Sequence, residues 1–442
     1  MRLTTMRLVF MLVGTMAIPT ATLCAEPTVI SVEKATELAL AHNLSLQADS
    51  FSLTEARRTM NSAWNNLLPS ISAWATLTDP TLPQAVTSPS TSSTSAPTLT
   101  AGLSASLTLS TTLANQIKGA ALNYKAGAIT YDAAKKALVR DVSKAFYQIL
   151  LVQAEIDVEK QAIEAAKKAY DVAMEKYSNG LVSRYDMLSA QVNWESMKPD
   201  LASYQVVYDS DLATFKHSLG IERSRDVRLS GKIGADPVEL EANQLIDQHV
   251  ADRLDVLSAE NTLNILENSY REAIASLAPT LSLGYKLSST LSGDAYSTSW
   301  FDVGNNWSNL AGTLSFTLTL PLDPFIPGSS TATSIANFRD RIAQQKLVLQ
   351  STKESAAIEI ENYVRQINEY MNSMKSLTLN VELAQEAYKL AADAYRSGTE
   401  QLLQVQDAQV ALQRARLKLL TQEYNYVAGL LDVEYALNGK AW

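Results

Sequence analysis

The chain contains the same arrangement of residues twice, and this duplication limits the fold more than any other feature of the sequence. Residues 169–192 align without a gap with residues 387–410. Shorter segments match in the same order, residues 67–72 with 277–282 and residues 103–109 with 314–320. Because the matching segments keep one order in both halves, the simplest account is a duplicated structural unit.

Each unit contains one long segment with a heptad period. Large apolar side chains recur at heptad spacing in the first unit at Val142, Ile149, Ile156, Ile163, Tyr170 and Tyr177. The matching positions of the second unit are Ile360, Ile367, Met374, Val381, Tyr388 and Tyr395. A companion row of apolar residues rich in Ala accompanies both. A heptad period sustained over this length predicts long coiled-coil helices rather than the core of a globular domain.

The order of elements predicts two structural repeats. Each repeat reads as a helix, two strands joined by a loop, a long helix, a tight turn and a returning helix. The first repeat covers residues 26–238 with its loop at 79–101, and the second covers 239–442 with its loop at 289–311.

The short helices are expected to stack end to end, because two of them together match the length of one long helix at about 1.5 Å per residue. We expect the helix at 183–219 to stack on 241–276, and the helix at 400–438 to stack on 32–66. Pro199 is expected to kink the first of these, since proline removes a backbone donor inside a helix.

Residues 1–25 have the features of a signal peptide for export. Two Arg precede an apolar stretch at 8–18, and Ala25 offers a small residue for cleavage. Cys24, the single cysteine, is an alternative site of lipid attachment, although Leu23 stands where a lipoprotein has a small residue. Cleavage after Ala25 is favoured, and lipidation of Cys24 stays open.

Four segments alternate apolar and polar residues as strands with two different faces do. Residues 103–109, 281–288 and 314–320 place Leu, Phe or Tyr on one face and mostly Ser and Thr on the other. Residues 71–78 are less regular because Trp74 falls on the polar face. No stretch after the signal peptide is long and apolar enough for a membrane-spanning helix, so any crossing must use strands. The apolar face suits lipid and the hydroxyl face a water-filled lumen, although a soluble sheet packed on a helix also alternates.

Four strands cannot close a barrel, and open strand edges are not tolerated in lipid. Three copies of the chain would supply twelve strands, which lies within the range of such barrels. The loops between the strands would then face the cell exterior. Aromatic residues that could mark the membrane interfaces are Trp64, Trp74, Trp300, Phe301 and Trp307.

Composition excludes several classes of function. The formal net charge of −9 argues against nucleic acid as a partner. Three histidines, His42, His217 and His249, stand without metal-ligand spacing. The sequence has no glycine-rich phosphate loop and no nucleophile elbow. We therefore expect no enzyme activity, no metal and no cofactor.

Together with the duplication, the hairpin turns at 177–186 and 395–400 and the strand exit at 318–322 resemble the TolC-like outer-membrane factor family. The resemblance covers almost all of the chain after the signal peptide. It implies a mixed α and β fold, in which long antiparallel coiled-coil helices form a periplasmic α-barrel and four transmembrane β-strands per protomer form a 12-stranded barrel in a homotrimer. It also implies a location in the bacterial outer membrane, extending into the periplasm.

The resemblance further implies a channel-tunnel that serves as the passive exit duct of a tripartite efflux or type I secretion system. A periplasmic adaptor and an inner-membrane transporter would be its partners, besides outer-membrane lipid. The turn residues that match the family's adaptor-docking tip are Gly180, Leu181, Val182, Ser183, Gly398 and Thr399.

The family closes its tunnel at a periplasmic aperture, and the chain matches that pattern in part. Asp407 matches the narrowest acidic ring, Tyr395 the gating tyrosine and Asp186 its partner. The sequence departs from the pattern where Glu400 replaces the gating arginine and Gln404 replaces a second acidic residue. Arg184 could pair with Glu400 and so reverse the charges of that link.

Two alternatives from other classes remain at this stage. A structural or adhesive coiled-coil protein of the cell envelope would keep the heptads, but it would need neither alternating strands nor an acidic ring. A pore-forming toxin that inserts after secretion is the second alternative. The duplication, with its matched helix lengths, argues against both.

Overall fold

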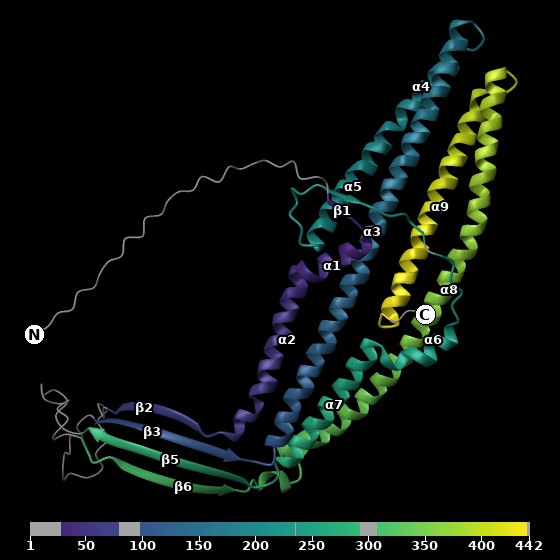
Figure 1. The fold of residues 1–442 in the computed structure, drawn as a ribbon. Helices are drawn as coiled ribbons and strands as arrows, with labels where there is room; N and C mark the ends of the chain where they lie inside the picture. The colour runs from purple at the N-terminus through teal and green to yellow at the C-terminus, as the bar shows by residue number, and fades with distance from the viewer. Residues whose placement is uncertain (1–27, 79–97, 235, 292–306, 440–442) are drawn as a thin grey trace, which may run out of the picture.

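The protein is a long rod of helices with a four-stranded sheet at one end (Figure 1). The computed structural model describes residues 28–78, 98–234, 236–291 and 307–439. The predicted signal peptide, Cys24, the central parts of both strand loops, Trp300 and Phe301 lie outside the described residues. Among the helices of the described residues, none combines the length and the apolar character needed to cross a membrane.

Two very long helices form the backbone of the rod, as the heptad period predicts. α3 covers Leu113–Ser178 and α8 covers Ser330–Ser397. The heptad residues Val142, Ile149 and Ile360 are almost fully buried. Because these residues recur on one stripe of each helix, the helices pack along their length.

The returning helices are shorter. The first return is split into α4 (Arg184–Ser196) and α5 (Lys198–Ser218), while α9 (Leu402–Ala436) runs without interruption. Pro199 lies in the first turn of α5, where a missing N–H does no harm. The expected kink is therefore a complete break between two helices at Met197.

The helices that lead into the strands lie beside the other half of the long helices. The first repeat has α1 (Val32–His42), α2 (Leu44–Ser62) and the short 3₁₀ turn η1 (Ala63–Leu67). The second has α6 (Ala242–His249), η2 (Val250–Asp252) and α7 (Leu254–Ala275), with η3 (Asp323–Phe325) after the strands.

The predicted stacking partners are wrong. The Asn43 side chain at the start of α2 donates to the carbonyl oxygen of Ser218 at the end of α5, over 2.9 Å. The Asn438 side chain after α9 donates to the carbonyl oxygen of Asp252 before α7, over 3.1 Å. α5 therefore meets α2, and α9 meets α7, so each stacked pair lies within one repeat.

The linker between α5 and α6 explains this arrangement. Its strand β4 (Val227–Leu229) pairs in parallel with β1 (Thr28–Ile30), which holds the end of the first repeat beside its own beginning. Gly220 has φ +66°, and a Cβ there would stand 2.6 Å from the His42 carbonyl oxygen. Only glycine permits this close approach between α5 and α1.

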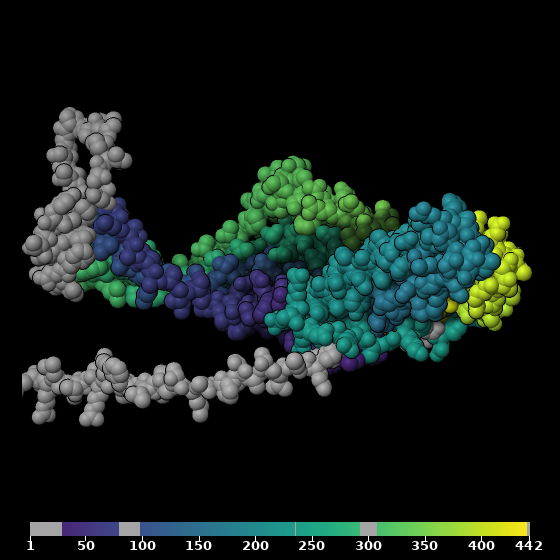
Figure 2. All heavy atoms as spheres, turned by 90° about the horizontal axis from the view of Figure 1, so that it is seen from above, coloured from purple at the N-terminus to yellow at the C-terminus, as the bar shows by residue number. Residues whose placement is uncertain are grey.

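The helices form a bowed layer rather than a closed bundle. α3 packs against α2 and against α4 and α5 on one side, and against α7 and α9 on the other, while α8 packs against α7 and α9. Seen from above, the green part of α8 stands out from the line of the purple and teal helices (Figure 2). The layer is therefore curved across its width.

The four long strands form one antiparallel sheet in the order β2-β3-β5-β6. Their bounds are β2 (Ser70–Thr78), β3 (Thr98–Leu109), β5 (Thr280–Leu291) and β6 (Ala311–Thr319). The predicted loops at 79–101 and 289–311 are longer than the structure allows, because β3 already begins at Thr98 and β5 continues to Leu291. The alternation of the strands includes Leu99 and Leu291. These two leucines are cross-strand partners.

Candidate functional site

One face of the sheet is apolar and exposed. The register places Leu103 opposite Leu287, Leu107 opposite Leu283 and Leu283 opposite Phe316, so leucines and aromatic residues line up across the strands. Ile71, Phe316 and Leu318 are 76%, 69% and 70% exposed. An apolar surface of this extent is unusual on a soluble monomer and indicates contact with another apolar phase.

The opposite face carries ladders of hydroxyl groups. The hydroxyl oxygens of Ser70 and Ser106 lie 2.7 Å apart, and those of Ser72 and Ser104 lie 2.8 Å apart. Thr100 and Thr290 form a similar contact of 3.1 Å between β3 and β5. These polar side chains suit contact with water.

Two larger side chains interrupt the hydroxyl face. The Lys286 ammonium nitrogen lies 4.3 Å from the centre of the Trp74 ring. Trp74 and Gly102 are cross-strand partners, and Lys286 is the partner of Ser104 on the same face. The side chain that the alternation singled out as irregular is therefore part of a cation–π contact.

At the far end of the rod, both hairpins turn at a glycine. Gly180 and Gly398 have φ +70° and +84°, a left-handed conformation that favours glycine after a helix. The N–H of Leu181 donates to the Lys176 carbonyl oxygen, and that of Thr399 to the Ala394 carbonyl oxygen. The two matching turns of the duplicated sequence thus have the same hydrogen-bond pattern.

The first hairpin turn is capped more strongly than the second. The Ser183 hydroxyl accepts from the Asp186 N–H, and the Asp186 carboxylate accepts from both the N–H and the hydroxyl of Ser183. This capping box fixes the start of α4. Leu181 is 72% exposed at the apex of the turn, beside the partly exposed Val182.

Tyr395 packs inside the tip, between the two hairpins. It is only 5% exposed and lies in an apolar cluster with Ala173 of α3, Ala190 of α4 and Val405 of α9. Burial raises the pKa of the Tyr395 hydroxyl, and the nearby Asp186 carboxylate adds to this effect. Within the described residues, no group forms a hydrogen bond with the buried Tyr395 hydroxyl.

Lys176 joins the hairpins at the same point. Its ammonium group donates to the carbonyl oxygen of Tyr395 and lies 4.2 Å from the centre of the Tyr395 ring. The carbonyl belongs to the last turn of α8, where a positive charge is favourable. One side chain of α3 therefore holds the end of α8.

Three of the predicted aperture residues lie at the start of α9. Gln404 and Asp407 are exposed in its first two turns, and the exposed Glu400 lies two residues before α9 begins at Leu402. Arg184 is also exposed, and no ion pair among the described residues joins it to Glu400. The predicted link between these two is not formed within one chain.

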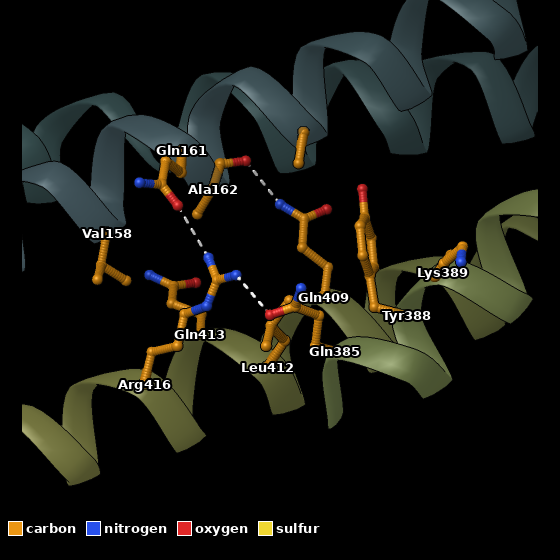
Figure 3. Close-up of a pocket in the computed structure, with 11 residues that line it drawn as sticks. Val158, Gln161, Ala162, Gln385, Tyr388, Lys389, Gln409, Leu412, Gln413 and Arg416 are labelled. Carbon is orange, nitrogen blue, oxygen red and sulfur yellow. Dashed lines mark hydrogen bonds between the residues drawn. The ribbon is translucent and has the colours of Figure 1, made fainter. Parts of the chain in front are cut away.

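Between the tip and the middle of the long helices, α3, α8 and α9 line an open pocket of about 350 Å³ (Figure 3). The Gln409 amide donates to the Ala162 carbonyl oxygen over 2.7 Å, and Arg416 donates to Gln161 and Gln385 over 2.9 and 3.2 Å. These contacts cross between helices and order the packing of α9 against its neighbours.

Beside this pocket, a glutamate is buried in α3. Glu159 is 1% exposed, and its carboxylate accepts from the Gln413 amide over 2.5 Å. Burial raises the pKa of the Glu159 carboxyl, and the negative charge of Asp200 in α5 raises it further. No cluster of three metal-ligating side chains occurs within the part of the chain that the structure describes.

Comparison of the sequence with known protein families shows which family the chain belongs to. The family described as outer membrane efflux protein matches residues 35–220 and 245–439. The chain belongs to the outer membrane efflux protein family. This membership confirms the predicted family and the predicted outer-membrane location.

Relatives of this chain are distant in sequence. Outer membrane protein TolC of Escherichia coli strain K12 is 21% identical over 317 residues, which are 70% of this chain and 63% of that protein. The probable efflux pump outer membrane protein TtgC of Pseudomonas putida is 25% identical over 320 residues, which are 69% of this chain and 62% of that protein. The match thus spans slightly less than two thirds of these relatives.

Solved structures share the fold over a larger part of the chain. The crystal structure of CusC superposes with a TM-score of 0.77 at 18% identity, covering 92% of both chains. The outer membrane channel CmeC of Campylobacter jejuni gives a TM-score of 0.76 at 18% identity, covering 92% of this chain and 85% of that one. The predicted fold class, long helices combined with a small set of strands, is confirmed.

The sequence did not point to two side chains of α3, Lys176 and Glu159. Lys176 stands one residue before Tyr177 of the heptad pattern, and its contact lies on another hairpin. Glu159 lies within the heptad segment as a single acidic residue among many. In both cases the period predicts the helix, but nothing in the sequence identifies the partner across the interface.

Proposed function

We propose that three copies of this chain form a channel across the bacterial outer membrane. Their twelve strands would close into a barrel, and their helices would continue as a tunnel into the periplasm. The channel would be the passive exit duct of a tripartite efflux or type I secretion system.

The two-faced sheet is the observation that carries this proposal. It presents Phe316 and Leu318 to the outside, while the next residues along the strand, such as Thr317, carry hydroxyls. β2 and β6 are its edge strands in the described residues. A lipid-facing sheet needs both edges paired, and neighbouring copies of the chain supply that pairing.

The opposite end of the rod is the proposed partner site. The exposed first turn, with Leu181 and Val182, would dock a periplasmic adaptor, and the tip would face an inner-membrane transporter. The capping box of Ser183 and Asp186 supports this role because it presents the turn in one conformation. Gly180, Gly398 and Thr399 set the shape of the two turns.

The same tip is the proposed aperture. Asp407 and Gln404 in the first two turns of α9, with Glu400 just before the helix, would line the narrowest part, and a three-fold ring of Asp407 would favour cations. Tyr395 would hold the hairpins together by the packing of its ring between them, with Asp186 close to it at the start of α4. Because Arg184 and Glu400 do not pair within one chain, their link would have to form between neighbouring chains.

Efflux of small compounds is the form of transport that the relatives favour. The relative from Pseudomonas putida is named as a probable efflux pump component, and another from that species is named for toluene efflux. We propose an efflux role of this kind here. The energy for transport would come from the inner-membrane transporter.

Two substitutions at neighbouring positions of β6 test the membrane proposal. Leu318→Arg places a charge on the apolar face, which destabilises a barrel by an amount that falls from about 2–4 kcal/mol at the bilayer centre toward the interfaces. Thr317→Arg places the same charge on the hydroxyl face. We expect Leu318→Arg to reduce the amount of protein inserted in outer membranes and Thr317→Arg to leave it close to wild type. Equal insertion of both variants would contradict the proposal.

A further inference from the structure

The hydroxyl face of the sheet contains a single charged side chain. Lys286 is the only Asp, Glu, Lys or Arg in β2, β3, β5 and β6 as the structure describes them. Around it, the face is formed mainly by the hydroxyls of Ser and Thr, including Ser104 directly opposite. A lone charge among neutral groups dominates the local electrostatic potential.

Trp74 restricts where this charge can lie. The ring stands over Gly102, where a Cβ would meet a ring carbon of Trp74 at 3.0 Å and the Leu287 carbonyl oxygen at 2.5 Å. The glycine therefore leaves the space that the ring fills. With its ammonium nitrogen 4.3 Å from the ring centre, Lys286 lies against the wall of the sheet.

The contact joins strands from the two repeats. Trp74 belongs to β2 and Lys286 to β5, with β3 between them. The matched positions of the duplicated sequence do not reproduce this pair, because Gly284 stands where the first repeat has Trp74. Each chain therefore contributes one such pair and one positive charge.

We propose that Trp74 and Lys286 form an anion-attracting site on the water-facing wall of the exit duct. The inference rests on the proposed function, since the three lysines face a common lumen only when three chains close the barrel. The ligands would be small inorganic or organic anions, held by the ammonium group beside the aromatic ring. This site opposes the acidic face of Asp407 at the other end of the rod.

Ion selectivity in planar bilayers measures the site directly. The reversal potential of the channel in a potassium chloride gradient gives the permeability ratio of potassium to chloride. Lys286→Gln should raise this ratio about threefold at 0.1 M salt, where a charge acts over roughly 10 Å. At 1 M salt, where screening limits that distance to roughly 3 Å, the difference between the variants should shrink.

Two controls separate charge from pore shape. Lys286→Arg keeps the charge and should keep the wild-type ratio. Lys232→Gln removes an exposed lysine from the linker between α5 and α6, far along the rod from the sheet, and should also leave the ratio unchanged.

A double-mutant cycle tests the part that Trp74 plays. If Trp74 positions the lysine, Lys286→Gln should change the ratio less in a Trp74→Leu background than in the wild type. Trp74→Phe retains an aromatic face and should preserve most of the effect. An equal effect of Lys286→Gln in both backgrounds would overturn the role of Trp74.

The outcomes distinguish this inference from the proposed function. Channels that conduct normally, but whose ratio is the same in wild type and Lys286→Gln at low salt, would overturn the anion site and leave the channel intact. Wild-type protein that forms no channels would overturn the proposed function, and the anion site with it. A salt-dependent rise in the ratio that occurs for Lys286→Gln, but not for Lys286→Arg or Lys232→Gln, supports the channel function and the anion site together.

Discussion

The ammonium group of Lys176 in α3 donates to the carbonyl oxygen of Tyr395 in α8 and lies 4.2 Å from the centre of its ring. This contact joins the two hairpins that the duplicated sequence produces. It also lies within one turn of both tip glycines along their helices, where the hairpins would have to separate if the tip opens.

Lys176→Gln should weaken the closed tip. A cation–π contact and a hydrogen bond from a charged donor together contribute about 1.5 kcal/mol in a partly exposed site, which is roughly a tenfold change in the open population. We expect a higher mean conductance in planar bilayers. Lys168→Gln is the matched control, because the ion pair of this exposed lysine is with Glu164 of its own helix. Equal conductance of both variants would argue against this role.

Tyr395→Phe should have little effect, in contrast to a mechanism that depends on the tyrosine hydroxyl. The hydroxyl is buried, and no described residue bonds to it, so its removal should change stability by no more than about 0.5 kcal/mol. Tyr395→Ala should destabilise the tip by about 3 kcal/mol because it empties the cluster around Ala173 and Val405. Thermal unfolding together with bilayer conductance checks both. A leaky Tyr395→Phe channel would mean that the hydroxyl has a partner in the assembled channel.

Glu159 should make stability depend on pH. Burial raises the pKa of its carboxyl in the folded chain above the unfolded value. The contribution of Glu159 to the free energy of unfolding is therefore fully present below the ordinary pKa of glutamate. It is lost as pH rises through the pKa of Glu159 in the folded chain. Glu159→Gln removes this titration, so the variant should melt at a higher temperature than wild type at neutral pH and at a similar temperature in acid.

Glu164 on the same helix is a suitable control because its pKa is shifted in the opposite direction. Hydrogen bonding to Lys168 lowers the pKa of the exposed Glu164 carboxyl. Its stabilising contribution is present above the ordinary pKa of glutamate and is lost as pH falls. Glu164→Gln should therefore gain no stability at neutral pH, and melting curves between pH 4 and 8 compare the two variants. A similar gain from both would contradict the assignment to Glu159.

The sequence predicts the long elements well and the contacts between them poorly. The heptad period locates α3 and α8, and alternation locates the strands, because both signals repeat many times along one segment. The stacking of α5 on α2 depends on a few local contacts, such as Asn43 with Ser218, which no period encodes. That prediction was therefore wrong, although the helical spans on which it rested are close to those of the structure.

For the side chains of the site as well, the sequence predicts local features better than contacts between distant segments. Gly180 and Gly398 were found because a tight turn after a helix requires glycine, and their positive φ values agree. Trp74 stood out only as an exception to the alternation, since its partner Lys286 lies on a strand of the other repeat. The pairing of Arg184 with Glu400 was proposed from charge, whereas the structure places Lys176 between the hairpins.

Asp407 should determine cation preference at the tip. It is exposed on α9, and a ring of three carboxylates attracts cations. Asp407→Asn should lower the potassium-to-chloride permeability ratio at low salt by about threefold. Asp393→Asn is the control, because Asp393 is exposed near the same tip but pairs with Arg396 of its own helix. An equal ratio in wild type and Asp407→Asn would place the narrowest acidic ring elsewhere.

The native mass of the detergent-purified protein, with the bound detergent subtracted, tests the central claim most directly. The account predicts three chains per particle, because the exposed apolar face and the edge strands β2 and β6 need neighbouring copies. A monomer that stays folded without detergent would contradict it, since its strands would then meet water rather than lipid.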